Sequence, residues 1–81
     1  MTEQLINVKN MLGDIKEDDS VPKNIRSKIN EVICEIGNED CEVDIKVSRL
    51  LNKLEEISED VNLPSYIRSD ILMTIGILSE I

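Results

Sequence analysis

The chain lacks histidine, tryptophan and phenylalanine altogether, and it has a single tyrosine, Tyr66, among its 81 residues. Without histidine there is no Ser-His or Cys-His pair to activate a nucleophile, and zinc sites lose a common ligand. The three glycines are scattered, and no Gly-rich phosphate loop or Gly-Lys-Ser/Thr sequence occurs. We therefore expect a protein that is not an enzyme and that has no catalytic residue, cofactor or metal.

Positive charge is scarce, because nine Lys and Arg stand against 17 Asp and Glu, a formal net charge of −8 at pH 7. Phosphate-binding surfaces need clustered basic residues, whereas those in this chain are spaced singly. One tyrosine also provides no set of aromatic side chains on which bases could stack. Direct nucleic-acid binding is therefore not expected, but a basic partner protein would be attracted by the negative charge.

The acidic residues gather in two clusters, at positions 14–19 and 55–60. Glu55 and Glu59 are four residues apart, so two carboxylates on one helix face could hold a divalent metal. Di-metal helical bundles combine such glutamates with histidine, however, and residues 39–44 lack the Asp/Asn spacing and glycine of a calcium loop. We interpret the clusters as solvated acidic surfaces, with a carboxylate-held metal as the alternative.

Long hydrophobic runs are also absent, so no segment is expected to span a bilayer. Residues 1–4 lack the basic and apolar regions of a secretory signal. The two cysteines, Cys34 and Cys41, fill only half of a four-ligand zinc set, and free thiols are the rule in reducing compartments. These features predict a cytoplasmic protein with free cysteines and no membrane segment.

The most informative feature that the sequence does contain is an internal repeat. A shift of 42 places residues 5–39 over residues 47–81 and gives ten identical pairs. The identical pairs are Leu12/Leu54, Ile15/Ile57, Glu17/Glu59, Asp18/Asp60, Pro22/Pro64, Ile25/Ile67, Arg26/Arg68, Ser27/Ser69, Ile29/Ile71 and Ile33/Ile75. We therefore predict a single domain, residues 1–81, that consists of two copies of one unit.

Each copy is predicted to be a helical hairpin. Apolar residues recur every three or four positions through four segments, and no segment alternates with the period of a strand. Pro22 and Pro64 suit the opening turn of a helix, and Gly37 with Asn38 suits a helix end. The sequence thus predicts an all-α protein with helices at 3–17, 22–37, 43–59 and 64–80. We expect the two hairpins to pack as a compact bundle, with an open two-repeat solenoid as the alternative.

The hairpin pattern is similar to a known repeat class. Leucines on a first helix, an Asp before a Pro-containing turn and Ile-Arg at the start of a second helix resemble the HEAT-type repeat. Two runs are more specific: Asp-Asp-Ser-Val-Pro-Lys-Asn-Ile-Arg at 18–26 and Ile-Ser-Glu-Asp-Val-Asn-Leu-Pro-Ser-Tyr-Ile-Arg-Ser at 57–69. They resemble an uncharacterised family of short, acidic, all-helical archaeal proteins over nearly the whole chain. The resemblance implies a four-helix fold and an unassigned function, and it transfers no catalytic or ligand residue.

Asp18 and Arg26 in the first copy have the same spacing as Asp60 and Arg68 in the second. Each carboxylate could accept backbone N–H bonds in the turn or pair with the arginine, and either contact would define the hairpin geometry. The other interpretation is a binding or catalytic pair. Because the arrangement occurs in both copies, we favour a structural role.

The two copies differ on the last helix, where Tyr66, Met73 and Ile77 form a second apolar stripe at helical spacing. The matching positions of the first copy, 24, 31 and 35, are all polar, and Leu72 and Gly76 flank the stripe. The stripe either packs against the first hairpin, as stacked repeats require, or forms an interface with a second copy or a partner.

We therefore predict a non-enzymatic protein–protein interaction module that self-associates through its last helix, because so small a domain gains stability from association. The alternative is a nucleic-acid or ribosome-associated factor. The sequence assigns neither a biological process nor the identity of a partner.

Overall fold

Four α-helices follow one another in the computed structural model, which describes residues 3–81: α1 (Glu3–Lys16), α2 (Lys23–Ile36), α3 (Val43–Ser58) and α4 (Ser65–Leu78). Every helix begins and ends within two residues of its predicted bounds, and residues 3–81 contain no strand. The predicted all-α fold is therefore confirmed. Residues 1 and 2, the start of the segment considered for a secretory signal, lie outside the described residues.

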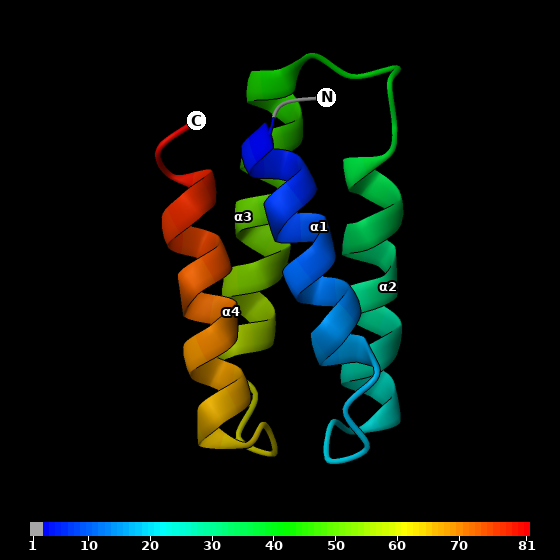
Figure 1. The fold of residues 1–81 in the computed structure, drawn as a ribbon, viewed down its shortest axis with the longest axis vertical. Coiled ribbons are helices and arrows are strands. Elements are labelled where there is room, and N and C mark those ends of the chain that lie inside the picture. Colours follow the sequence, from blue (N-terminus) through cyan, green and yellow to red (C-terminus); the bar gives the residue numbers. More distant parts are fainter. Residues whose placement is uncertain (1–2) are drawn as a thin grey trace.

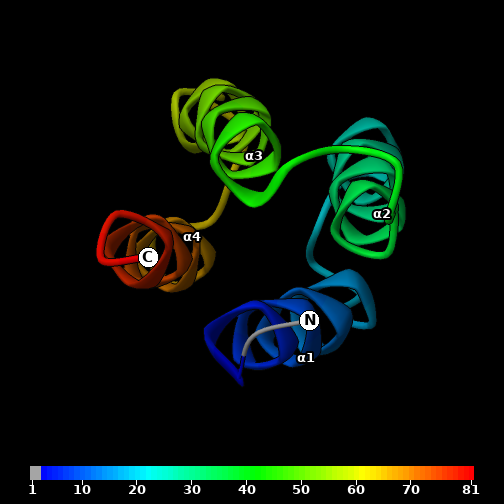
Figure 2. The same ribbon diagram turned by 90° about the horizontal axis from the view of Figure 1, so that it is seen from above.

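The helices run alternately up and down, and they stand at the four corners of a bundle (Figures 1 and 2). Each helix packs against its two neighbours, and α1 packs against α4 as well as against α2. The radius of gyration is 11.7 Å, and a compact domain of this length is expected at about 11.7 Å. The contact between α1 and α4 thus closes a compact bundle and rules out the open solenoid.

One hydrophobic core runs through the middle of the bundle and holds the four helices together. It takes one face of every helix, at the three- and four-residue spacing of the sequence pattern, and a residue from each hairpin turn. Its buried members are Leu5, Val8, Leu12, Ile15, Val21, Ile25, Ile29, Val32, Ile36, Val47, Leu50, Leu54, Ile57, Leu63, Ile67, Ile71 and Leu78. Since Val21 and Leu63 lie just before the prolines, the core also anchors both turns.

The two prolines start the second helix of each hairpin. Pro22 and Pro64 occupy the N-cap positions with nearly the same backbone angles, φ −58° and ψ 151° for Pro22 and φ −56° and ψ 144° for Pro64. Their carbonyl oxygens accept the first helical hydrogen bonds, from the N–H groups of Arg26 and Arg68, each at 2.9 Å. A proline loses nothing at this position, because a helix leaves its first N–H groups without a partner.

The end of α2 differs in one respect from the usual glycine cap. Gly37 follows the helix but remains in the right-handed region, at φ −78° and ψ −7°, so the conformation that only glycine adopts readily is not used. Instead, the last carbonyl of the helix, that of Ile36, accepts a hydrogen bond at 3.2 Å from Nζ of Lys46. Lys46 is only 6% exposed. A cation at a helix C-terminus is favoured by the helix dipole, so this buried lysine completes the cap from α3.

Candidate interaction site on α4 and the cleft beside α1

The hairpin turns are held by arginines that bond to the backbone. Nη2 of Arg26 donates to the carbonyl oxygens of Asp18 at 3.0 Å and Val21 at 3.3 Å. Nη2 of Arg68 donates in the same way to the carbonyls of Asp60 at 2.8 Å and Leu63 at 3.5 Å. Each guanidinium therefore ties the start of a helix to the turn before it, in both halves of the molecule.

The carboxylates of the two aspartates face the turns, not the arginines. Oδ1 of Asp18 accepts the N–H of Ser20 at 2.9 Å, and Oδ1 of Asp60 accepts the N–H of Asn62 at 2.8 Å. The ion pairs of residues 3–81 lie elsewhere on the surface, between α2 and α3. Of the two contacts that the sequence left open, the structure thus shows the backbone bonds of the aspartates.

The first turn also reaches across to the second hairpin. The Tyr66 hydroxyl donates to Oδ2 of Asp18 at 3.0 Å, and it lies against the hydroxyl of Ser20, which donates to Oδ1 of Asp18 at 2.6 Å. The bonds from Ser20, and then the one from Tyr66, lower the pKa of the Asp18 carboxyl below its ordinary value. Asp18 is therefore a charged hydrogen-bond acceptor that joins α4 to the α1–α2 turn.

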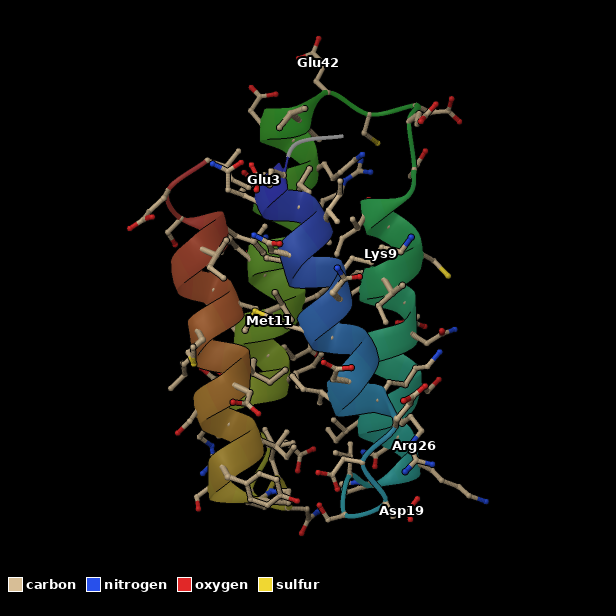
Figure 3. All side chains as sticks on the ribbon, in the orientation of Figure 1. Glu3, Lys9, Met11, Asp19, Arg26 and Glu42 are labelled. Atoms are coloured by element: carbon tan, nitrogen blue, oxygen red, sulfur yellow. The ribbon has the colours of Figure 1, made fainter. Side chains whose placement is uncertain are left out.

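A cleft of about 390 Å³ opens between α1 and α4 next to this junction. Its lining combines apolar, aromatic and acidic side chains and contains no lysine or arginine: Met11, Asp14, Ile15, Asp18, Tyr66, Ile67 and Asp70. Figure 3 shows Met11 between the two helices. Ile15 and Ile67 belong to the buried core, so they form the floor of the cleft. We refer to this feature as the α1/α4 cleft.

The predicted interface residues occupy the exposed surface of α4. Leu72 is 52% exposed, Met73 59% and Tyr66 54%. Gly76 is also exposed, and a Cβ atom added there would meet no atom within 4 Å. Tyr66 lines the α1/α4 cleft and bonds to Asp18, so we call only Leu72, Met73 and Gly76 the α4 outward face. Ile77 is separate from it, because that side chain packs partly against the core.

The α4 outward face carries no charge, although the protein has a net charge of −8. Between Ser65 and Leu78 the charged residues are Arg68, which bonds to turn carbonyls, and Asp70, which lines the α1/α4 cleft. An exposed apolar surface without charge is typical of association sites.

The negative charge of the protein is concentrated at the ends of the bundle. All nine Lys and Arg lie within the helices together with eight acidic residues, and the other nine acidic residues lie in the turns and after α4. Asp19 and Glu42 illustrate the two ends in Figure 3. In the described part of the chain, no three cysteine or carboxylate side chains are placed to hold a metal ion together.

Neither cysteine belongs to the α4 outward face or lines the α1/α4 cleft. Cys34 and Cys41 are both free thiols. Sγ of Cys41 accepts a hydrogen bond from Nη1 of Arg49 at 3.3 Å. Arg49 also forms an ion pair with Glu35, at 3.4 Å. The sequence predicted neither the Arg49–Glu35 ion pair nor the burial of Lys46 against the Ile36 carbonyl. Both contacts join α3 to α2 at positions without a repeat pattern.

Comparison with known proteins gives the family. Residues 1–81 match the uncharacterised protein family UPF0147. A UPF0147 protein of Pyrococcus horikoshii is 34% identical over 79 residues, which are 98% of this chain and 83% of that protein. One from Thermoplasma volcanium is 29% identical over 82 residues, which cover 100% of this chain and 92% of the relative.

A solved structure has the same fold. The crystal structure of a protein of unknown function, MMP1188, superposes with a TM-score of 0.91 and 33% sequence identity. The superposition covers 98% of this chain and 90% of that protein. Within residues 3–81, no helix has both the length and the apolar character needed to cross a membrane. Because the family match covers the whole sequence and the solved structure has the same fold, we conclude that the chain belongs to the UPF0147 family, which is found in archaea and has no assigned function.

Proposed function

We propose that this protein is a non-enzymatic interaction module that self-associates through the α4 outward face. The observation that carries the proposal is the pair of adjacent, half-exposed apolar side chains, Leu72 and Met73, on a helix face without charge. Their burial against a second copy would remove apolar surface from water, which is the main driving force of protein association.

Charge supports the choice of this face. Two molecules that each carry −8 repel one another, so the least costly contact is one that adds no further like charges to the interface. Most small homo-oligomers use a two-fold axis, in which the same patch meets itself. The α4 outward face suits such a contact, because uncharged side chains would face uncharged side chains, and Gly76 lets the backbones come close.

Sedimentation over a range of protein concentrations tests the proposal. We expect an association that Met73→Glu and Leu72→Glu each abolish, because a charge would then be buried at the interface without a partner. Met73→Glu reproduces Glu31, the matching residue of the first copy, so the substitution suits an exposed helix position. Ser27→Glu, on the exposed surface of α2, adds the same charge and should leave association unchanged.

Two results would overturn self-association through α4. The first is a monomer at every concentration, and the second is equal weakening by Ser27→Glu and Met73→Glu. Circular dichroism of each variant should match the parent protein, since all three sites are exposed.

The alternative function, a nucleic-acid or ribosome-associated factor, has less support. Every helix that carries basic residues also carries acidic ones, and the turns carry only acidic ones, whereas a surface that binds a phosphate backbone needs clustered basic residues. Retardation of RNA or DNA at low salt, lost as salt rises, would favour this alternative. The cytoplasmic location stays a prediction, to be tested by cell fractionation.

A further inference from the structure

We propose that the α1/α4 cleft receives the side chain of a lysine or arginine from a basic partner protein. The inference takes the binding role from the proposed function, but it does not depend on self-association. It rests on a comparison between two clefts of this molecule that occupy matching positions in the repeat.

The matching cleft lies between α2 and α3 and is lined by Lys28, Glu31, Lys53, Glu56 and Ile57. Nζ of Lys28 lies 3.5 Å from Oε1 of Glu56, so the cleft supplies its own cation. Its volume is about 100 Å³, against about 390 Å³ for the α1/α4 cleft. The cleft between α2 and α3 is thus lined by two lysines and two glutamates, and Lys28 pairs with Glu56 across it.

The shift of 42 residues shows what the α1/α4 cleft lacks. Asp14 matches Glu56, but Asp70 stands where the other cleft has Lys28, and Met11 stands where it has Lys53. Both cations are therefore replaced. The carboxylate of Glu56 is kept as Asp14, Asp70 adds a carboxylate in the place of a lysine, and Glu31 has no counterpart in the lining of the wider cleft.

The lack of a basic partner for Asp14 and Asp70 within the described part of the chain is the second observation that indicates a cationic ligand. Within residues 3–81, neither Asp14 nor Asp70 forms an ion pair, and no side-chain hydrogen bond engages either carboxylate. Two like charges that line one cleft repel each other, and an ammonium or guanidinium group between them would remove that cost. Lys28 between α2 and α3 shows that such a cleft accommodates a cation.

The remaining lining fits the rest of a basic side chain. Met11 and the isoleucine floor provide apolar surface for the methylene groups of a lysine or arginine. Tyr66, held at the edge by its bond to Asp18, adds an aromatic ring to the lining, and aromatic rings attract cations. A free metal ion would use none of these apolar contacts, so the cleft suits a basic side chain on a peptide.

The test is an NMR titration of the isotope-labelled protein with the peptide acetyl-Gly-Leu-Lys-Leu-Gly-amide. The matched probe has norleucine in place of lysine, which keeps the methylene groups and removes the charge. We expect the lysine peptide to shift the backbone amide signals of Met11, Asp14, Tyr66 and Asp70, and the norleucine peptide to bind at least about tenfold more weakly.

Variants locate the cation. Asp70→Lys introduces the residue type of the matching cleft, so the ammonium group of the new lysine should fill the site. We expect it to lower the affinity for the lysine peptide by about tenfold or more and to raise the melting temperature of the protein. Glu55→Lys, an exposed substitution on α3 with the same change in net charge, should alter affinity much less. Equal weakening by the two variants would overturn the proposal, as would equal binding of both peptides or signal shifts confined to the acidic turns.

A third variant separates this inference from self-association. Leu72 lies two positions from Asp70, about 200° around the helix, and so points away from the cleft. Leu72→Glu should abolish association and leave peptide binding intact. Loss of peptide binding in that variant would show that the cleft depends on a second copy and would contradict the proposal of a separate partner.

Discussion

The hydroxyl of Tyr66, in the first turn of α4, donates a hydrogen bond at 3.0 Å to Oδ2 of Asp18, which lies 48 positions earlier in the α1–α2 turn. This bond joins the two hairpins at one end of the bundle. The matching residues, Asn24 and Asp60, are not joined by such a bond. The bundle is therefore closed differently on its two sides, and the cleft lies on the side of the bond.

Replacement of Tyr66 by phenylalanine should lower the free energy of unfolding by about 0.5–1.5 kcal/mol, the net value of a typical hydrogen bond. Urea denaturation measures the change. The same replacement in an Asp18→Ala background should cost much less, because the acceptor is already gone. An equal cost in both backgrounds would show that the ring, and not the hydroxyl, stabilises the fold.

The lowered pKa of Asp18 makes the stability depend on pH in a defined direction. A carboxyl whose pKa is lower in the folded state stabilises the fold above its unfolded pKa, about 3.9. That contribution is lost as the pH falls through the folded pKa. Thermal denaturation of the protein and of Asp18→Asn should therefore differ most at neutral pH and converge below about pH 4. A constant difference across this range would contradict the assigned hydrogen bonds.

The two turn arginines should differ in importance. Nε of Arg68 donates to the carbonyl of Ser58 at 2.9 Å, whereas the buried Nε of Arg26 has no hydrogen-bond partner. Arg68→Lys should cost about 1–2 kcal/mol of unfolding free energy, because a lysine cannot reach all three carbonyls, and Arg26→Lys should cost less. Chemical denaturation gives both values, and a larger loss for Arg26→Lys would show that burial of the aliphatic stem dominates.

A buried threonine on α4 has an apolar counterpart in the first copy. Thr74 is 0% exposed and donates its hydroxyl to the Ile71 carbonyl at 2.6 Å, within the same helix. The matching residue in α2 is Val32. Thr74→Val should raise the free energy of unfolding by about 0.5–1 kcal/mol, because a buried hydroxyl is removed at nearly constant volume.

Val32→Thr is the reverse substitution and provides the control. It should lower the free energy of unfolding by about 1–2 kcal/mol, since it buries a hydroxyl in a core without a polar partner from another helix. Both changes can be measured by urea denaturation. Stabilisation by Val32→Thr would indicate an unrecognised polar partner in that part of the core.

Much of the fold could be predicted because its signals are local. The three- and four-residue spacing of leucine, isoleucine and valine located the four helices, and Pro22 and Pro64 located the two helix starts. The Asp18 and Asp60 bonds also stay within their own turns, two residues along the chain. Contacts over such short separations leave a mark in the sequence, because the same few residues make both the pattern and the bond.

The exposure of the α4 stripe could be predicted only in part. Met73 of the stripe and the flanking Leu72 are exposed on α4, but Ile77 packs partly against the core and Tyr66 bonds to the first hairpin. Helical spacing places residues on a face and does not say which neighbouring helix covers that face. The buried Lys46 on the Ile36 carbonyl had no signal at all, because a lysine among apolar residues is ordinarily exposed.

The sequence by itself therefore determined the helices, the turns and the absence of histidine and of clustered basic residues, all of which depend on residue type and local spacing. Only the tertiary structure decided that α1 meets α4, that Tyr66 reaches Asp18, and that Asp14 and Asp70 line a cleft with no lysine or arginine in its lining. The physical reason is that these contacts arise when the core draws together segments from opposite ends of the chain. Their geometry depends on the packing of all four helices at once.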